Sequence, residues 1–190
     1  MKRDIITVPD KRLRQKAAKV HVVTDEILDI IRQMKAASLD WEKDHPHEIS
    51  AAMAAPQIGH MYKIVIIRDS FDDKNVQDFT ALINPEIIKT EGKIVEDYEG
   101  CLSVPKIYGL VSRHDKVRVK ALLENGQEVR VKATDSLART LQHEIDHVNG
   151  ILFIDHIKDK KKAFFELDKD GELQPLDYET EIKDNEQLWG

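Results

Sequence analysis

The sequence predicts an α+β fold in which mostly antiparallel β-sheets pack around a central helix. Apolar side chains recur at helical spacing in residues 24–44 and 135–150. Short runs rich in β-branched residues lie between these segments, as expected for strands. The clearest pair, 115–124 and 127–133, flanks the Asn-Gly at 125–126, a dipeptide typical of a two-residue hairpin turn. Helices and antiparallel strands in this order indicate the α+β class.

The elements before the hairpin follow from local patterns. Residues 11–20 are expected to form a short helical turn. Thr24 is a candidate N-cap for the first long helix, which ends before the polar loop 45–50 and its proline. Buried or half-buried strands are expected in three further β-branched runs, at 62–68, 79–88 and 92–99.

The second helix has Leu137, Leu141, Ile145 and Val148 on one face. Asp135 or Ser136 can cap its start, and Gly150 stands where a left-handed C-terminal residue belongs. We find no internal repeat and no linker, so residues 1–190 are expected to form a single domain. Its charged C-terminal segment, 158–190, is expected to cover the surface, with a small hairpin around Asp170-Gly171.

Composition narrows the class of protein. A chain of 190 residues with 41% hydrophobic and 34% charged residues can build a sizeable core. The net charge of −6 and the lack of a long basic run argue against a nucleic-acid-binding surface. No apolar run is long enough for a membrane span or a secretory signal, so we expect a cytoplasmic protein. The single cysteine, Cys101, excludes an internal disulfide.

Residues 142–147, "QHEIDH", indicate a metal site on the second helix. His143 and His147 are four residues apart and therefore share one helical face. Glu144 is close enough to touch a metal-bound water without being a ligand. This is the H-E-x-x-H pattern of metal-dependent hydrolases, in which the glutamate is the general base. The alternative is a helix whose surface carries two unrelated histidines.

A catalytic site of this kind normally has a third protein ligand. The longer pattern that ends in a third histidine fails here, because Phe153 occupies that position. Asp155, His156 and Glu166 remain as candidates downstream, and Cys101 as a candidate upstream. A lone cysteine is more often a small buried apolar residue than a ligand, so the spacing alone leaves the choice open.

Three motifs together resemble those of the peptide deformylase family. They are "AAPQIG" at 54–59, "EGCLSVP" at 99–105 and "QHEIDH" at 142–147, and the similarity extends over roughly residues 5–157. The resemblance implies a Cys101, His143 and His147 ligand set. It also implies ferrous iron as the metal, with zinc, nickel or cobalt able to replace it, although the donor set on general grounds suggests zinc.

The resemblance implies a hydrolase that removes the N-terminal formyl group from nascent formyl-methionyl polypeptides, at the ribosome. The nucleophile is then a metal-bound hydroxide, and Glu144 transfers the protons. Gln57 and the backbone N–H of Leu102 are expected to stabilise the oxyanion. Glu99 and Arg113 are expected to form a structural ion pair, while Asp146 anchors the helix rather than binding the metal.

The substrate pocket is expected to border the metal helix. Ser136, Arg139 and Thr140 precede His143 by seven, four and three residues, so they share or border its face. A formyl-methionyl substrate needs an apolar slot there. Two of these residues carry hydroxyls, and Arg139 can pack its stem while placing its charge outside. Gly100 is expected to contact the substrate as well.

The first motif departs from the family pattern. Ser50 and Ala52 replace its two glycines in "SAAMAAPQ", a segment expected to lie against the substrate backbone. Either Ala52 is strained in a glycine-only conformation or the loop has shifted. We therefore expect Ala52→Gly to raise kcat/KM on formyl-Met peptides. Two alternatives stay open beside an active deformylase: a related hydrolase of another N-formyl or N-acyl amine or of peptides, and a non-catalytic relative.

Overall fold

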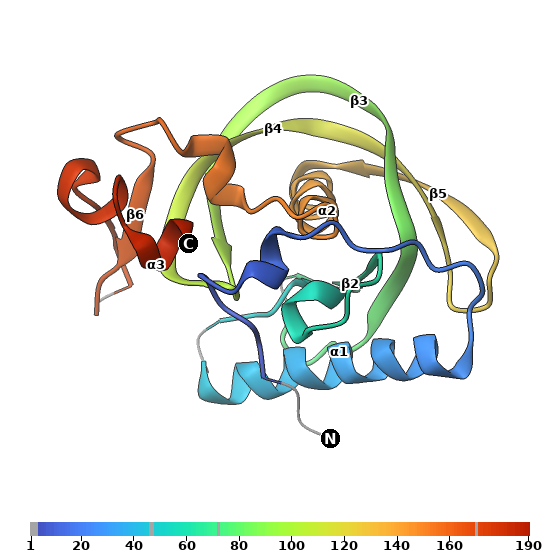
Figure 1. Ribbon diagram of the computed structural model, residues 1–190. Coiled ribbons are helices and arrows are strands. Elements are labelled where there is room, and N and C mark those ends of the chain that lie inside the picture. Colours follow the sequence, from blue (N-terminus) through green and yellow to red (C-terminus); the bar gives the residue numbers. More distant parts are fainter. Residues whose placement is uncertain (1–3, 46–47, 72, 170) are drawn as a thin grey trace.

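The computed structural model describes residues 4–45, 48–71, 73–169 and 171–190 (Figure 1). Its helices are α1 (Asp25–Asp44), α2 (Asp135–His147) and α3 (Glu186–Trp189). Its strands are β1 (Ala52–Ala54), β2 (Ile64–Arg68), β3 (Phe79–Cys101), β4 (Val104–Leu122), β5 (Glu128–Thr134), β6 (Phe164–Leu167) and β7 (Leu173–Pro175). Short 3-10 turns occupy Lys11–Arg14, Ala55–Ile58 and Phe153–Ile157.

The strands form a seven-stranded antiparallel sheet in the described part of the chain. Its order is β1-β2-β3-β4-β6-β7, with β5 pairing to β4 beside this path. The α+β class with antiparallel strands is therefore confirmed. The sequence predicted several sheets, but the described residues form one strongly curved sheet. The long strands β3 and β4 run through the whole sheet and join its two ends (Figure 1).

The length of β3 corrects the prediction of two separate strands at 79–88 and 92–99. The strand runs without a break from Phe79 to Cys101. Its pairing with β4 shifts register between Ile87 and Lys89 and again between Glu91 and Ile94. Extra residues of this kind bend a strand without ending it. Residues 89–91, between the two predicted strands, are polar and lie on the bend.

The hairpin of β4 and β5 forms where it was predicted, but its turn is longer than predicted. Leu123 N donates to Gln127 O, and Gly126 N donates to Leu123 O. Gly126 has φ of 79°, a left-handed conformation that glycine adopts without strain. The connection is therefore a three-residue loop over 124–126 rather than a two-residue turn.

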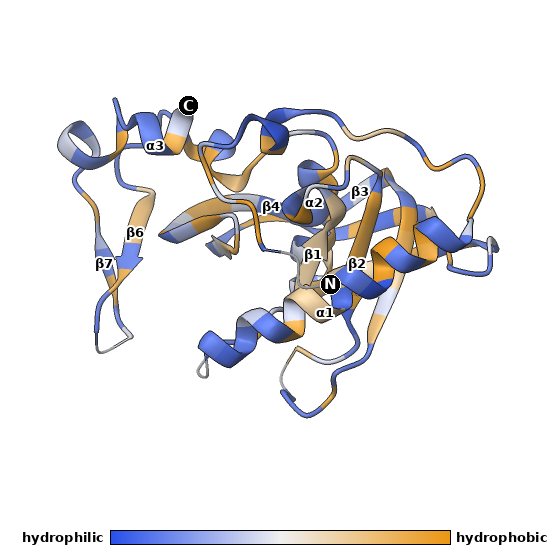
Figure 2. Ribbon diagram, turned by 60° about the horizontal axis from the view of Figure 1, so that its bottom comes forward, coloured by the Kyte–Doolittle hydropathy of each residue, from blue (hydrophilic) through white to orange (hydrophobic). Residues whose placement is uncertain are grey.

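Helix α1 packs its apolar face on the sheet. The Thr24 hydroxyl accepts a hydrogen bond from Ile27 N, as predicted for an N-cap. Ile30 and Met34 are buried in one core cluster with Ile66 of β2. The hydropathy colouring in Figure 2 shows the largely hydrophobic strand β2 next to this helix.

Helix α2 lies within the curve of the sheet and contacts strands β1 to β5 (Figure 1). Leu141, Ile145 and Val148 are buried against Val117 and Val119 of β4. This apolar face fixes the rotation of the helix, so its opposite face points toward the end of β3.

The start of α2 differs from the prediction, because Thr134 is the N-cap residue and makes no side-chain cap. Asp135 is the first residue of the helix, and its φ is 52°. Gly150, with φ of 78°, is left-handed as predicted.

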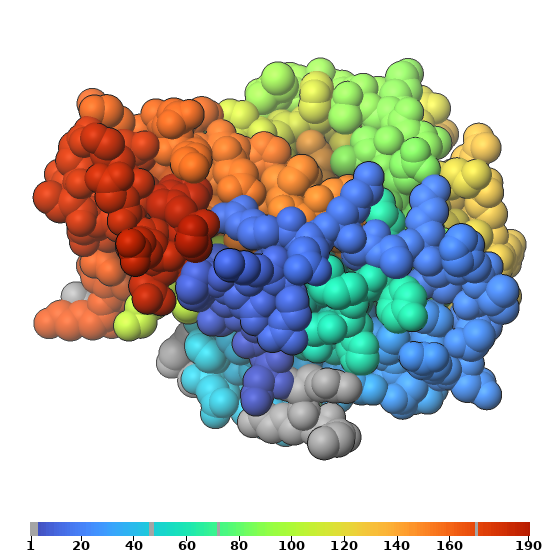
Figure 3. All heavy atoms as spheres, viewed as in Figure 1, coloured from blue at the N-terminus to red at the C-terminus, as the bar shows by residue number. Residues whose placement is uncertain are grey.

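The C-terminal segment is more than a surface cover. β6 and β7 form the predicted hairpin, although Asp170 itself lies outside the described residues. Ile182 and Leu188 are buried with Leu13 and Phe153 in a third core cluster. Figure 3 shows the C-terminal segment, in orange and red, in contact with the N-terminal segment, in dark blue. None of the described helices is both long and apolar enough to cross a membrane.

Candidate metal centre and active site

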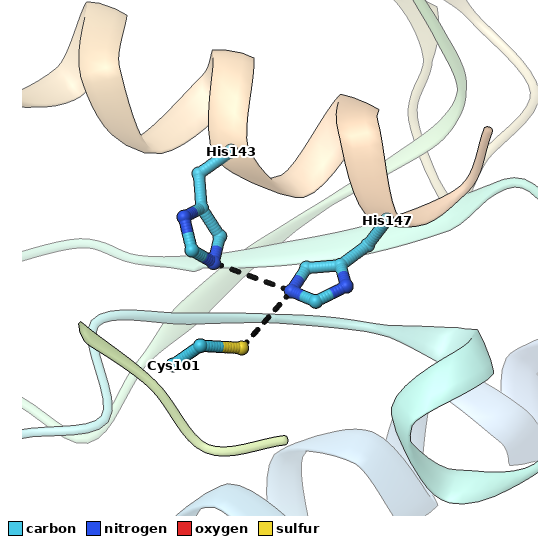
Figure 4. A group of neighbouring side chains, drawn as sticks. All are labelled: Cys101, His143 and His147. Atoms are coloured by element: carbon cyan, nitrogen blue, oxygen red, sulfur yellow. Dashed lines mark hydrogen bonds between the residues drawn. The ribbon is translucent and has the colours of Figure 1, made fainter. Parts of the chain in front are cut away.

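Three side chains that can bind a metal converge at one point (Figure 4). His143 and His147 project from α2, and Cys101 approaches from the end of β3. The two Nε2 atoms of the histidines lie 3.2 Å apart, and Sγ of Cys101 lies 3.2 Å from Nε2 of His147. All three candidate donor atoms lie within 4.8 Å of one another.

This donor set fits a divalent transition metal. Bonds of ~2.0–2.3 Å to a tetrahedral ion would place pairs of ligand atoms roughly 3.3–3.8 Å apart, which is close to the observed contacts. One thiolate and two imidazoles suit zinc, iron, nickel or cobalt. Within the described ranges, no other group of three His, Cys, Asp or Glu side chains comes close enough to hold an ion.

The downstream candidates for the third ligand lie outside this group. Asp155 forms an ion pair with Arg14. Nε2 of His156 lies 2.7 Å from Oδ2 of Asp146. Glu166 is exposed on β6. The geometry therefore brings Cys101, and none of these three, to the two histidines of α2.

Glu99 holds the ring of His143 in place. Its Oε2 accepts a hydrogen bond from Nδ1 of His143 at 2.9 Å, which leaves Nε2 to face Cys101. Arg113 donates two hydrogen bonds to the carboxylate, at 2.9 and 3.0 Å, and also pairs with Asp146. Burial alone raises the pKa of Glu99, but the hydrogen bonds from His143 and Arg113 outweigh it and hold that pKa well below its ordinary value.

Arg139 contacts the same carboxylate, contrary to the expectation that its charge lies outside. Its Nη1 donates to Glu99 at 2.7 Å and to the carbonyl of Val111 at 2.9 Å, and its Nη2 donates to the carbonyl of Val95 at 2.8 Å. The sequence does not predict these contacts of Arg139. The two carbonyls can accept its hydrogen bonds only because β3 and β4 bend around α2.

Glu144 is buried beside the metal ligands and lines the cavity in front of them. Its Oε2 has no hydrogen-bond partner among the described residues. Burial raises the pKa of Glu144 to about 7, while the nearby His143 opposes this rise. A carboxyl group with a pKa near neutrality can both accept and donate a proton under physiological conditions.

Gln57 approaches the thiol of Cys101 from the turn that follows β1. Its Oε1 accepts a hydrogen bond from Ala54 N at 2.8 Å, which orients the amide. Its Nε2 then points to Ser103 Oγ at 3.1 Å and to Cys101 Sγ at 3.7 Å. Leu102 follows the thiol and lines the same cavity. Gln57 and Leu102, the two residues predicted to supply the oxyanion donors, therefore line the same cavity as Cys101.

A cavity of about 580 Å³ opens in front of these groups. Four of the five predicted substrate-binding residues line it: Ala52, Gly100, Arg139 and Thr140. The fifth, Ser136, is exposed at the start of α2 and does not line the cavity, which corrects that prediction. Seven residues are nearly two helical turns, and at that distance from His143 the helix has already left the cavity.

The residues that replace the motif glycines are accommodated without backbone strain. Ser50 is buried, its N–H donates to Glu42 at 2.8 Å, and its hydroxyl accepts from Ser38 at 2.6 Å. Ala52 is extended in β1 and pairs with Ile67. A glycine-only conformation is therefore not required at Ala52, and the strain considered from the sequence is absent. The methyl group of Ala52 still lines the cavity.

Tyr108 is a cavity residue that the sequence analysis missed. Its ring covers Gly100, where an added Cβ would lie only 2.7 Å from Cε1 of the ring. Its hydroxyl donates to Glu48, which also lines the cavity, at 3.3 Å. Burial raises the pKa of Tyr108 to about 12, and the charge of Glu48 adds to the rise. The tyrosine hydroxyl therefore stays neutral and donates a hydrogen bond. Position 100 has to be a glycine, because any side chain there would collide with the Tyr108 ring.

Comparison with known proteins identifies relatives over most of the chain. The polypeptide deformylase family model matches residues 2–163. A peptide deformylase from Thermomicrobium roseum is 42% identical over 173 residues, which cover 90% of this chain and 94% of the relative. A peptide deformylase structure from Legionella pneumophila aligns with a TM-score of 0.72 at 37% identity, over 82% of this chain and 86% of that one. A Met-Ala-Ser-bound peptide deformylase from Acinetobacter baumannii aligns with a TM-score of 0.73 at 27% identity, over 83% and 99%.

Proposed function

Since this chain belongs to the polypeptide deformylase family, we infer that it is a hydrolase that removes the N-terminal formyl group from nascent polypeptides. The reaction releases formate and a free amine. The inference rests on one observation at the site. Cys101, His143 and His147 converge beside the buried carboxyl group of Glu144. The test is formate release from formyl-Met peptides by the metal-loaded protein.

Cys101, His143 and His147 would hold one divalent metal, for which their donor atoms are already grouped. When bound, the metal would act as a Lewis acid and lower the pKa of a water molecule enough for hydroxide to form near neutral pH. Glu99 and Arg113 keep His143 in the tautomer that offers Nε2 to the metal. Helix α2 would be the central element around which the sheet wraps, as its contacts with β1 to β5 support.

Glu144 would move the protons. Glu144 lines the cavity, and its Oε2 has no hydrogen-bond partner among the described residues, so the carboxyl group can accept a proton from the attacking water. The same carboxyl group then delivers the proton to the departing amine. Burial raises the pKa of Glu144, which favours uptake of the proton by this carboxyl group.

Gln57 and Leu102 would stabilise the negative charge that develops on the formyl oxygen. The Gln57 amide is held by Ala54 and Ser103 before any substrate arrives. A donor fixed in this way costs no reorganisation when charge develops on the substrate. The backbone N–H of Leu102, the residue after Cys101, would be the second donor.

We propose ferrous iron as the metal in the cell, and the cytoplasm, at the ribosome, as the place of reaction. The lone cysteine of the chain lies in the donor set, where oxidation of either the iron or the thiol would stop catalysis. We expect the iron-loaded protein to lose activity in air or peroxide and the nickel-loaded or cobalt-loaded protein to keep it longer. Activity followed over time in parallel samples tests this; equal decay for every metal would rule out iron-centred oxidation.

The cavity would bind the formyl-Met end of an extended peptide. The relative from A. baumannii binds Met-Ala-Ser, which has the sequence of a deformylated product. The methionine side chain would lie along Gly100, Thr140 and the stem of Arg139, whose guanidinium is already bound by Glu99 and strand carbonyls. With its charge bound in this way, Arg139 leaves mainly methylene groups for an apolar side chain.

Ala52→Gly is expected to raise kcat/KM on formyl-Met peptides, but by no more than about threefold. The change removes a methyl from the cavity wall and relieves no backbone strain, since Ala52 is extended in β1. Relief of ~1–3 kcal/mol of strain would instead give roughly 5-fold to 150-fold. Steady-state kinetics of both proteins measure the difference. A decrease would contradict this prediction and show that the methyl group of Ala52 contributes to substrate binding.

A further inference from the structure

The C-terminal hairpin, which begins after the last residue that the family model matches, supplies part of the cavity wall. The family match ends at residue 163, and β6 begins at Phe164. Leu167, the last residue of β6, lines the same cavity as His143 and Glu144. β6 is joined to the sheet through β4, at Ile107 to Gly109, so the hairpin is fixed to the strand that follows the thiol.

One face of the hairpin continues the wall as an apolar strip. Residues that face each other across antiparallel strands point to the same side of a sheet. Phe165 faces Tyr108 of β4, and Leu167 faces Leu173 of β7. The ring of Tyr98, from β3, meets the ring of Phe165 edge-on with centroids 5.1 Å apart. We define the apolar strip as Tyr98, Tyr108, Phe165, Leu167 and Leu173.

The strip is open to solvent where it leaves the cavity. Tyr98 is 44% exposed and Leu167 is 38% exposed, and both are large apolar side chains at the cavity rim. The other face of β6 carries Phe164, which is 1% exposed in the core. Figure 2 shows β6 coloured as hydrophobic along most of its length. The core therefore accounts for one face of the strand and leaves the strip without a partner in the described residues.

We propose that the apolar strip binds apolar side chains of the formylated peptide downstream of its methionine. This inference rests on the proposed deformylase function. The strip begins at the cavity that would hold the formyl-Met end, and an extended chain advances about 3.3 Å per residue, so the following residues pass over it. The strip would then make the enzyme prefer nascent chains whose early residues are apolar.

Leu167→Asp tests the strip, because it places a charge on the strip and leaves the metal ligands and Glu144 untouched. We would measure formate release from formyl-Met amide, and from two series that extend formyl-Met-Ala by one to four residues, one with leucine and one with serine. In the wild type, KM should be lower for the leucine series. In the variant, KM for that series should rise about tenfold, the change expected when roughly 50 Å² of apolar contact is lost. The KM for formyl-Met amide should rise less than the KM for the leucine series, because the amide has no residue after methionine that could contact the strip.

Ile94→Asp is the matched control, because Ile94 is 65% exposed on β3 and does not line the cavity. Leu167→Met should behave as wild type, and Leu167→Ser serves as a second test if the aspartate lowers the thermal midpoint. Equal KM values for both series in the wild type would overturn the inference while formate release kept the proposed function intact. An equal loss on formyl-Met amide and on long peptides would overturn it too, and no formate from any formyl-Met substrate would reject both.

Discussion

Glu144→Ala is expected to lower kcat on formyl-Met peptides by about 10²–10⁴-fold while the bound metal stays at the wild-type level. The substitution removes the group that moves the protons and leaves Cys101, His143 and His147 in place. It also removes a buried carboxyl group whose Oε2 has no hydrogen-bond partner among the described residues. The thermal midpoint of the variant should therefore fall less than after loss of a core residue that is fully hydrogen-bonded.

The measurement combines formate release, metal content and thermal unfolding on one preparation. Glu96→Ala is a suitable control, since Glu96 is an exposed carboxylate on β3. Glu144→Gln keeps the volume of the side chain and should be nearly as inactive as the alanine variant. Activity of the alanine variant within a few-fold of wild type would show that another group transfers the protons.

Cys101→Ser is expected to weaken metal binding by on the order of 100-fold or more and to abolish activity in the ferrous enzyme. Metal ligands must be deprotonated, and a serine hydroxyl stays neutral where a thiol becomes a thiolate. The side chains have almost the same shape, so the packing around Gln57 and Ser103 should change little.

Metal content after dialysis against a graded chelator measures this loss. His156→Ala is the control, because His156 contacts Asp146 outside the donor group and should not affect occupancy. If Cys101→Ser kept its metal while His156→Ala lost it, the third ligand would be downstream of α2 rather than at the end of β3.

The helix motif shows what local sequence can predict. Positions 143, 144 and 147 are fixed relative to one another by helical geometry, so their shared location needed no knowledge of the rest of the fold. Cys101 is 42 residues before His143, and only the resemblance of the surrounding motifs brought it to the site. Spacing alone could not choose it over Asp155 or His156, because the choice depends on how β3 curves toward α2.

Other features could not be read from the sequence for the same reason. Arg139 is turned inward by two strand carbonyls whose availability depends on the bend of the sheet. The concern about Ala52 was a question of backbone conformation, which its residue type does not determine. The polar bend in β3 resembled a connection, since a bulged strand and two strands joined by a turn have similar local patterns. Tertiary context decided all three.

The most direct test of the deformylase function compares formyl-Met-Ala-Ser with acetyl-Met-Ala-Ser at full metal occupancy. A cavity built for a formyl group should reject the additional methyl, so formate release should exceed acetate release by about tenfold or more. Formyl-Met-Ala-Ser should also be turned over by the wild type and not by Glu144→Ala. Negligible formate from the fully metal-loaded wild type, or acetate released as fast as formate, would contradict the assignment and favour a non-catalytic relative or a hydrolase of other N-acyl amines.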